Sequence, residues 1–156
     1  MVGDSLSITI HQATVDDLEA LYKIERECFT VEAFTKEQIS YLLETSNAVS
    51  LIAQINNEIA GFIIGLIHDY GKTRTGHVYT IDVAVKYRRM GVGVRLLEEL
   101  EQIFIRRKVT VCYLEVRLGN VAARELYRKH GYTEVERIKN YYSRGTHGVR
   151  LVKKLS

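Results

Sequence analysis

A short glycine-containing segment near the middle of the chain has the residue types that bind phosphate groups. It reads Arg88-Arg89-Met90-Gly91-Val92-Gly93 and stands between a predicted strand and a predicted helix. The first N–H groups of a helix have no acceptor within it, and the helix dipole favours negative charge there. Glycine lets the backbone approach an anion without a Cβ in the way. Because Leu96 replaces the third glycine of a dinucleotide fingerprint, the segment predicts either another anion site or a tight strand-to-helix turn.

A second glycine-containing segment, Gly71-Lys72-Thr73, resembles the end of a Walker A loop. The upstream glycine, Gly65, lies one residue too far away for that motif, and no apolar-periodic helix follows. We therefore predict a surface hairpin loop here and no nucleotide site.

The cysteines and histidines form no pattern typical of metal binding or nucleophilic catalysis. Cys28 and Cys112 are far apart in the sequence, and the histidines show no His-x-x-x-His spacing. We expect no metal site, and we expect both cysteines to be small buried side chains.

The formal net charge of +3 conceals an uneven distribution along the chain. Residues 1–85 carry 5 basic and 12 acidic side chains, whereas residues 86–156 carry 17 basic and 7 acidic ones. Such a division suggests that the second half meets an anionic partner. A nucleic acid, a membrane surface and a phosphorylated cofactor all fit this observation alone.

The elements that must position these residues follow from the apolar pattern and from turn and capping residues. Thr14, Thr35 and Asn120 are predicted helix caps, and Asn56-Asn57-Glu58 is a predicted hairpin turn. Alternating strands and helices after residue 77 indicate partly parallel pairing, and hence an α/β or α+β fold with a mixed sheet. We predict strands at 7–12, 49–55, 59–68, 77–85, 111–117, 133–139 and 149–155, helices at 14–28, 35–43, 92–107 and 120–130, and a loop at 70–76.

The length and composition predict a single globular domain spanning residues 1–156. The chain is 46% hydrophobic and 26% charged, which is ordinary for a globular protein. The longest strongly apolar run, Ile59–Ile67, is too short for a membrane helix, which needs ~20 residues. The N-terminal residues lack the basic and apolar regions of a secretory signal, so we predict a cytoplasmic protein without membrane attachment.

A further motif follows the glycine-containing segment at fixed intervals. It comprises Leu114-Glu115-Val116-Arg117, Asn120, Ala123, Leu126-Tyr127 and Gly131-Tyr132. Together the two motifs resemble the GNAT N-acetyltransferase superfamily, in the peptide N-terminal acetyltransferase branch that includes ribosomal-protein alanine acetyltransferases and NatA-type catalytic subunits. The resemblance implies the GNAT fold, a mixed and mostly antiparallel sheet of about seven strands with a splayed central parallel pair and about four helices.

The resemblance also implies acetyl-CoA as cosubstrate and no metal. Backbone groups of one central strand would hold the acetyl and pantetheine parts, the glycine-containing segment would wrap the pyrophosphate, and an asparagine would bond the pantetheine arm. The basic half then has a defined anionic partner, and a direct nucleic-acid partner is not needed. The implied cosubstrate-binding residues are Ile81, Asp82, Val83, Arg88, Arg89, Met90, Gly91, Val92, Gly93, Val94, Asn120 and Tyr127.

The implied reaction is acyl transfer from a thioester to an amine by direct attack in a ternary complex. Glu115 matches the family position of a general base that acts through water, and Tyr127 matches that of the acid that protonates the departing sulfur. His77 matches a second base position, and which of the two is the main base stays open. Glu115 as a strand residue paired with an arginine, and Tyr127 as a core aromatic, are the structural alternatives.

Substrate choice follows from amine chemistry and from the resemblance. At pH 7 a larger fraction of α-amines than of lysine side chains is neutral, so a modest base suits protein N-termini. In the resembling branch the peptide is held by the loop between the first two helices and by the last hairpin, which map to residues 29–34 and 140–143. The implied wall residues are Phe29, Phe34, Tyr141 and Tyr142.

The implied partners are protein or peptide N-termini, among them nascent chains and ribosomal proteins, with an auxiliary subunit as an option. The acidic first half would suit a cationic amine. Two alternatives remain at this point: a GNAT enzyme for a small amine, polyamine or lysine side chain, and a CoA-sensing or nucleic-acid-binding module without turnover.

Overall fold

A computed structural model describes residues 7–29 and 33–155 of the chain. Among these residues, the chain forms seven strands, four α-helices and two 3₁₀ turns, the latter at Val15–Asp17 and Val85–Tyr87. The elements are β1 (Thr9–Gln12), α1 (Leu18–Cys28), α2 (Lys36–Glu44), β2 (Ala48–Ile55), β3 (Glu58–Tyr70), β4 (Thr73–Val83), α3 (Val92–Arg106), β5 (Val111–Arg117), α4 (Val121–Lys129), β6 (Thr133–Ser143) and β7 (Thr146–Lys154).

The strands form a mixed sheet in the order β1-β2-β3-β4-β5-β7-β6. Strands β4 and β5 are parallel, with Thr75–His77 opposite Val111–Tyr113, whereas β1/β2, β2/β3, β5/β7 and β6/β7 are antiparallel. This confirms the predicted fold, including its central parallel pair. The chain divides into two compact units: one comprises the residues up to Leu66 with Tyr79–Ile103, and the other comprises Ile67–Val78 with the residues from Phe104 onward.

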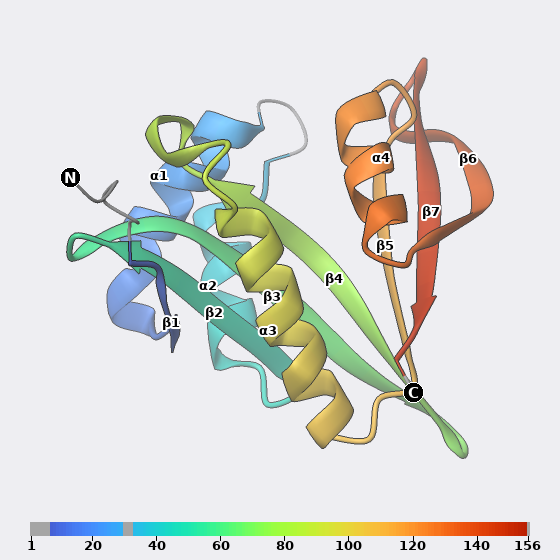
Figure 1. Cartoon of the computed structure of the whole chain (residues 1–156), viewed down its shortest axis with the longest axis horizontal. Coiled ribbons are helices and arrows are strands. Elements are labelled where there is room, and N and C mark those ends of the chain that lie inside the picture. Colours follow the sequence, from blue (N-terminus) through green and yellow to red (C-terminus); the bar gives the residue numbers. More distant parts are fainter. Residues whose placement is uncertain (1–6, 30–32, 156) are drawn as a thin grey trace, which may run out of the picture. The chain divides into compact units, whose positions relative to one another are not determined.

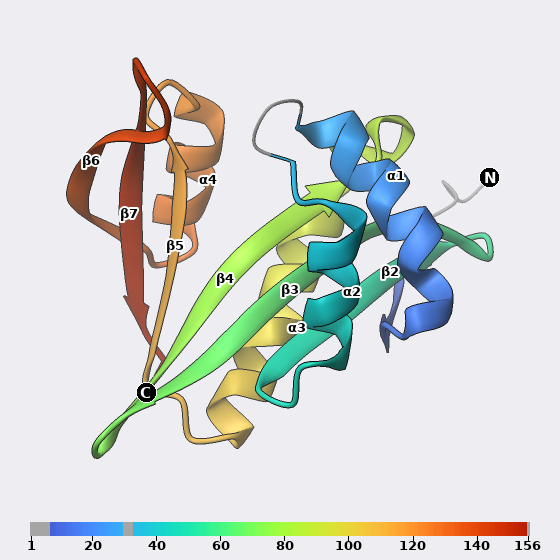
Figure 2. The same cartoon turned by 180° about the vertical axis from the view of Figure 1, so that it is seen from behind.

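The first unit has helices on both faces of its strands. Figures 1 and 2 show α3 on one face of the strands in this unit and α1 and α2 on the other. Leu21, Ile39 and Phe62 are fully buried where α1 and α2 meet the sheet. Removing such aliphatic and aromatic side chains from water supplies about 2 kcal/mol each, which anchors both helices to the strands.

Three predicted caps are confirmed. The Thr14 side chain accepts a hydrogen bond from the Asp16 amide, and its own amide donates to Asp17, although the first turn is a 3₁₀ turn. Thr35 and Gln38 form the predicted capping box of α2. Asn120 accepts from the Ala123 amide at 3.1 Å and begins α4.

The second unit consists of β5, β7 and β6 with the adjoining ends of β3 and β4 and with α4, which lies on one face of β5 (Figures 1 and 2). Arg124 on α4 donates to both carboxylate oxygens of Glu134 on β6 and to the Leu118 carbonyl. This bidentate contact fixes α4 against the sheet and so orients the turn that precedes it.

Gly76 on β4 is a glycine for reasons of space. A Cβ built at this position would overlap the ring of Phe104, which is fully buried at the end of α3. The ring therefore occupies the volume that any side chain at position 76 would need, next to His77 in the sequence.

Two predicted loops are shorter than expected. The predicted loop at 70–76 is only the two-residue turn Gly71–Lys72, because Arg74 is held in β4 by Asp69 and by the Thr110 amide. Residues 140–143, predicted as the tip of the last hairpin, belong to β6, and the turn itself is Arg144–Gly145. Pairing between β6 and β7 is irregular from Ile138 to Ser143.

No helix in the described part of the chain is both long enough and apolar enough to cross a lipid bilayer.

Candidate active site

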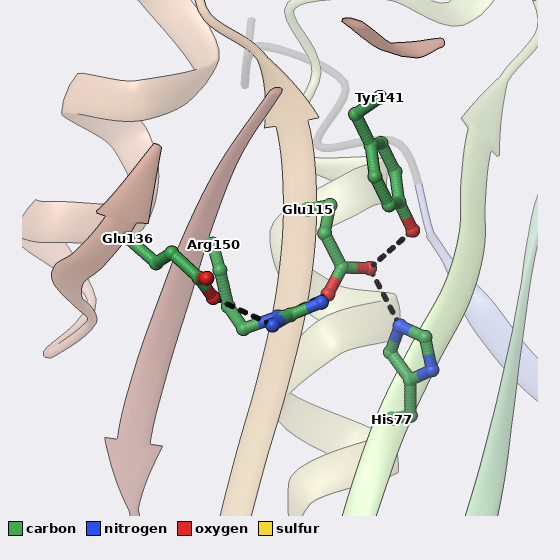
Figure 3. Close-up of polar contacts among 5 residues, drawn as sticks. All are labelled: His77, Glu115, Glu136, Tyr141 and Arg150. Atoms are coloured by element: carbon green, nitrogen blue, oxygen red, sulfur yellow. Dashed lines mark hydrogen bonds and ion pairs between the residues drawn. The ribbon is translucent and has the colours of Figure 1, made fainter. Parts of the chain in front are cut away.

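Two of the predicted catalytic residues contact each other within the second unit. His77 Nε2 lies 2.6 Å from Glu115 Oε1, and Figure 3 shows the ring on β4 pointing to the carboxylate on β5. The Glu115 side chain is 5% exposed and that of His77 is 17% exposed, so solvent screens this contact little. A carboxylate that fixes an imidazole in this way can serve proton transfer.

The strand register explains why these residues meet. His77 is opposite Tyr113 across the parallel pair, and the two rings stack with centroids 4.3 Å apart. Side chains two residues apart on a strand share a face, so Glu115 is on the same face as Tyr113 and within reach of the ring.

Glu115 accepts further hydrogen bonds from two neighbouring strands. Tyr141 on β6 donates its hydroxyl to Oε1 at 3.2 Å, and Arg150 on β7 donates Nε to Oε2 at 2.8 Å. Burial raises the pKa of the Glu115 carboxyl, but hydrogen bonds from His77 and Arg150, with their positive charges, lower the pKa more. The pKa is therefore below its ordinary value, and Glu115 is ionised at neutral pH.

The predicted wall residues Tyr141 and Tyr142 form one aromatic surface. Their ring centroids lie 4.9 Å apart in an edge-to-face arrangement, and the Arg117 guanidinium lies over Tyr142 at 5.9 Å from its ring centroid. Burial first, and then the charge and hydrogen bond of Glu115, raise the pKa of Tyr141 to about 12. Tyr141 therefore stays a hydrogen-bond donor throughout the physiological pH range.

A groove of about 630 Å³ lies beside these residues in the second unit. It is formed by the turn before α4 and by the β6–β7 turn, and it is lined by Arg117, Leu118, Gly119, Asn120, Gly145, Thr146 and His147. Asn120, predicted to bind the pantetheine arm, lines this groove, and its side-chain oxygen caps α4.

Tyr127, the predicted general acid, is 6% exposed on α4. Its ring meets the ring of Tyr132 edge on, with centroids 5.9 Å apart. The Tyr132 hydroxyl donates to Cys112 Sγ at 3.3 Å, so this second phenol has a structural partner of its own.

The glycine-containing segment lies in the first unit and forms a turn with positive φ angles directly before α3. Arg89 and Gly91 have φ angles of 64° and 82°, and the Arg95 amide donates to the Gly91 carbonyl as α3 begins. The amides of Val92, Gly93 and Val94 thus lie in the first turn of the helix, where backbone donors have no intrahelical acceptor. Nothing lies within 4 Å of a Cβ built on Gly91, so that side of the turn is open.

Arg88 is exposed, but its side chain contacts strand β4 and helix α1. Its Nε donates to the Val83 carbonyl at 3.2 Å, and a terminal nitrogen contacts Cys28 Sγ at 3.5 Å. These contacts of the Arg88 side chain therefore stabilise the turn. Met90 is exposed, and Ile81 and Val83 contact a Cβ built on Gly93, which places β4 against the start of α3.

A buried pair of carboxyl groups in the first unit was not predicted as a pair. The Thr80 hydroxyl lies 2.6 Å from Asp82 Oδ1 and 3.1 Å from Glu25 Oε1. A hydroxyl has one proton, so one carboxyl must itself be protonated for both contacts to be hydrogen bonds. Burial first, and then the hydrogen bond and charge of Glu25, raise the pKa of Asp82 to about 9, which identifies Asp82 as the neutral partner.

Glu25 connects this pair to the predicted substrate loop. Its Oε2 accepts a hydrogen bond from the Phe34 amide at 3.0 Å, and the Phe34 ring stacks on Tyr79 with centroids 6.4 Å apart. Phe29 ends α1 and is half-buried. Residues 30–32 of the predicted loop lie outside the described residues.

Neither cysteine has the environment of a nucleophile. Cys112 is buried, and burial followed by the charge of Asp82 raises the pKa of the Cys28 thiol despite the nearby Arg88. Among the described residues, no group of three or more potential metal ligands is found.

The comparison with known families identifies the fold and the chemistry together. A family model described as the acetyltransferase (GNAT) family matches residues 18–132. The chain belongs to this family. The match includes the glycine-containing segment, His77, Glu115 and Tyr127, so the GNAT enzyme carries its predicted motifs within the matched region.

Curated relatives share the length of this GNAT chain. An uncharacterised N-acetyltransferase of Methanocaldococcus jannaschii is 30% identical over 146 residues, which cover 93% of this chain and 90% of the relative. An N-alpha-acetyltransferase of Sulfurisphaera tokodaii is 29% identical and covers 87% of this chain and 86% of its own. The crystal structure of the ribosomal-protein-S18-alanine N-acetyltransferase from Escherichia coli has a TM-score of 0.83 at 26% identity, and covers 96% of this chain and 95% of its own.

The structure brings some of the predicted residues of the GNAT enzyme together and adds others. His77, Glu115 and Tyr141 form one cluster, with Tyr142 next to Tyr141. Arg150 and Glu136, which complete that cluster, were missed because only the strand register shows that they face Glu115. Asp82 was predicted only through its backbone, although a carboxyl between two apolar residues of a buried strand was a signal for its side chain.

Proposed function

We propose that this GNAT enzyme is an acetyl-CoA-dependent N-alpha-acetyltransferase that modifies the free amino terminus of proteins or peptides. The observation that carries the proposal is the 2.6 Å contact between His77 and Glu115, which provides a fixed proton acceptor for an attacking amine. Support also comes from relatives of the same length, one of which is named as an N-alpha-acetyltransferase.

The acetyl donor fits the open turn in the first unit. The amides at the start of α3 suit a pyrophosphate. Gly91 leaves one side of the turn free, and the first amides of the helix have no acceptor within it. We assign the loop from Arg88 to Val94 to the phosphates, the backbone of Ile81–Val83 to the acetyl and pantetheine groups, and Asn120 to the pantetheine arm. Acetyl-CoA supplies the thioester; the chain's own residues orient it and move protons.

The proposed reaction is a direct transfer. The neutral amine attacks the thioester carbonyl, a C–N bond forms and the C–S bond breaks. The proton lost by the amine passes to the pair formed by His77 and Glu115, and the Tyr127 hydroxyl gives a proton to the departing sulfur. Tyr127 then regains a proton from solvent before the next cycle.

The preference for an α-amine follows from proton affinity. An α-amine has a pKa of about 7.7–8.0, against about 10.4 for lysine, so a single weak base can deprotonate it near neutral pH. Phe29, Phe34, Tyr141 and Tyr142 are the proposed wall residues for the first residues of the peptide. The proposed substrates include nascent chains and ribosomal proteins, and both an auxiliary subunit and a cytoplasmic location stay predictions.

A panel of peptides that differ in the first residue tests the proposal. Each peptide is incubated with acetyl-CoA and the enzyme, and mass spectrometry locates the acetyl group. The same peptides with a blocked N-terminus and an internal lysine, together with polyamines, are the controls. We expect acetylation of free N-termini only. Acetylation of polyamines or lysine side chains without acetylation of N-termini would replace the proposal with a small-amine or lysine acetyltransferase.

A further inference from the structure

Arg150 lies between the candidate catalytic carboxylate and a second, exposed carboxylate. It is directly opposite Glu115 in the β5/β7 pairing and opposite Glu136 in the β6/β7 pairing. Its Nε donates to Glu115 Oε2 at 2.8 Å, and one terminal nitrogen donates to Glu136 Oε1 at 2.8 Å. Figure 3 shows the guanidinium in line between the two acids, on the side of Glu115 that faces away from His77.

The same guanidinium also contacts the aromatic ring that supports His77. Its central carbon lies 5.7 Å from the centroid of the Tyr113 ring, and that ring stacks on His77 with an interplanar angle of 11°. Arg150 thus touches both groups that hold the imidazole: the carboxylate that accepts its hydrogen bond and the ring on which it lies.

This environment determines which partner of the pair accepts a proton. Glu115 is ionised because His77 and Arg150 lower its pKa below the ordinary value despite burial, and a carboxylate of low pKa is a weak proton acceptor. An ionised carboxylate only accepts hydrogen bonds, so His77 Nε2 must be the donor at 2.6 Å. The lone pair of a neutral His77 ring is therefore on Nδ1.

We propose that Arg150 is a positioning residue of the acetyl transfer: it holds Glu115 aimed at His77 and compensates part of the carboxylate's negative charge, and thereby leaves His77 as the group that takes the amine proton. The proposal rests on the proposed function for the reaction it serves, but the state of the imidazole that it describes does not depend on turnover.

Arg150 also limits how strongly Glu115 attracts a proton to the ring. Glu115 and Tyr113 from β5 contact this imidazole, and Tyr141 from β6 and Arg150 from β7 contact the Glu115 carboxylate. With Arg150 present, part of the carboxylate's charge is compensated. Without it, the full negative charge would face His77 and stabilise the imidazolium, so the proton-accepting form would be available only at higher pH.

The experiment compares wild type with Arg150→Met, Arg150→Lys and Glu136→Gln. Imidazole carbon and nitrogen chemical shifts, assigned with His77→Gln, give the tautomer and the titration midpoint of His77. We expect the neutral ring to be protonated at Nε2 in the wild type, and the titration midpoint to be higher in Arg150→Met than in the wild type. Glu136→Gln removes only the exposed acid and should leave the midpoint unchanged. Arg150→Lys keeps the charge and should return the midpoint toward that of the wild type.

Kinetics provide the second readout. The acid limb of the pH profile of kcat/KM should move upward in Arg150→Met by the same amount as the midpoint, and Arg150→Lys should keep the limb but lose part of kcat, because an ammonium cannot hold two carboxylates in a fixed fork. An unmoved midpoint in a folded Arg150→Met protein, or a neutral ring protonated at Nδ1, would make Arg150 a mere cross-link between strands. If Arg150→Met does not fold, the His77 midpoint of Arg150→Lys is compared with that of Glu115→Gln, which lacks the carboxylate charge. A midpoint displaced from the wild-type value as far in Arg150→Lys as in Glu115→Gln would also overturn the proposal. Absence of peptide acetylation by the wild type would reject the proposed function alone, since the imidazole titration is measured without substrate.

Discussion

At the scale of single residues, two phenols in the second unit have separable roles. Tyr127 and Tyr132 are neighbours whose rings meet edge to face, and both are buried. The Tyr132 hydroxyl donates a hydrogen bond to Cys112 Sγ, whereas Tyr127 is our proposed acid for the sulfur of the acetyl donor. This arrangement provides a matched pair of substitutions that remove one hydroxyl each from similar surroundings.

Tyr127→Phe should lower kcat about a hundredfold or more while acetyl-CoA binding is largely kept, because a positioned acid contributes ~10²–10⁴ to the rate. Tyr132→Phe should leave kcat near the wild-type value and lower only the stability, by about 1 kcal/mol for the lost hydrogen bond. Stopped-flow or steady-state kinetics and calorimetric titration with acetyl-CoA measure the two effects. An unchanged kcat in Tyr127→Phe would remove this residue from the mechanism.

At the scale of elements, β4 and α1 are connected by a carboxyl group that keeps its proton. Thr80 and Asp82 on β4 and Glu25 on α1 form one buried hydrogen-bonded set, and Asp82 Oδ2 has no partner in it. Burial and the Glu25 carboxylate raise the pKa of Asp82 to about 9, far above the ordinary value of 3.8. Stability must therefore depend on pH through this position.

The free energy of unfolding of the wild type should fall as the pH rises, and we predict that Asp82→Asn abolishes this fall. An unfolded Asp82 loses its proton above its ordinary pKa of 3.8, whereas the folded protein keeps it up to about 9, so the stability of the wild type falls between these values. An asparagine amide can donate to Thr80 without that proton. Urea unfolding at pH 5 and pH 8 should show the wild type losing on the order of a few kcal/mol more than the variant over this interval. Equal losses in both proteins would contradict the prediction.

The elements also show what the sequence reveals and what it conceals. The bounds of β5 and the caps of α2 and α4 were predicted correctly because periodicity and capping are local signals. The extension of β4 to Thr73 was missed because it depends on pairing with β5 and on the contact between Arg74 and Asp69. Strand pairing of this kind depends on residues far apart in the sequence, so it leaves no local sequence signal.

The candidate site divides along the same line. Glu115 and His77 were predicted from motif positions, but the sequence places them far apart and leaves open which is the base. Arg150 and Glu136 carry no motif, and only the register of three strands makes them neighbours of Glu115. Residue types could therefore be predicted, whereas the charge balance around the carboxylate required the structure.

At the scale of the whole molecule, the uneven charge gains a specific interpretation. The 17 basic residues after position 85 include Arg88 and Arg89 in the proposed phosphate-binding turn, and the acidic excess precedes it. Such a long-range field acts on binding more than on the chemical step and is screened by salt, with a Debye length of about 10 Å at 0.1 M.

We therefore expect the KM for acetyl-CoA to rise several-fold when KCl is raised from about 50 to about 500 mM, while kcat changes little. Arg89→Gln should weaken this salt dependence, because it removes an exposed charge from the turn. Arg137→Gln, an equally exposed charge on β6, is the matched control and should retain it. A KM that is independent of salt in the wild type would argue against an electrostatic role for the basic half.

The close approach at Gly76 has a consequence for reading variation in this protein. Because the Phe104 ring fills the space of a side chain, even alanine at position 76 must displace either the ring or the strand that presents His77. A deep mutational scan would accordingly score position 76 as intolerant as a catalytic position, although glycine contributes no functional group. Tolerance profiles of this enzyme will thus mark two kinds of essential position, those that perform chemistry and those whose emptiness permits it.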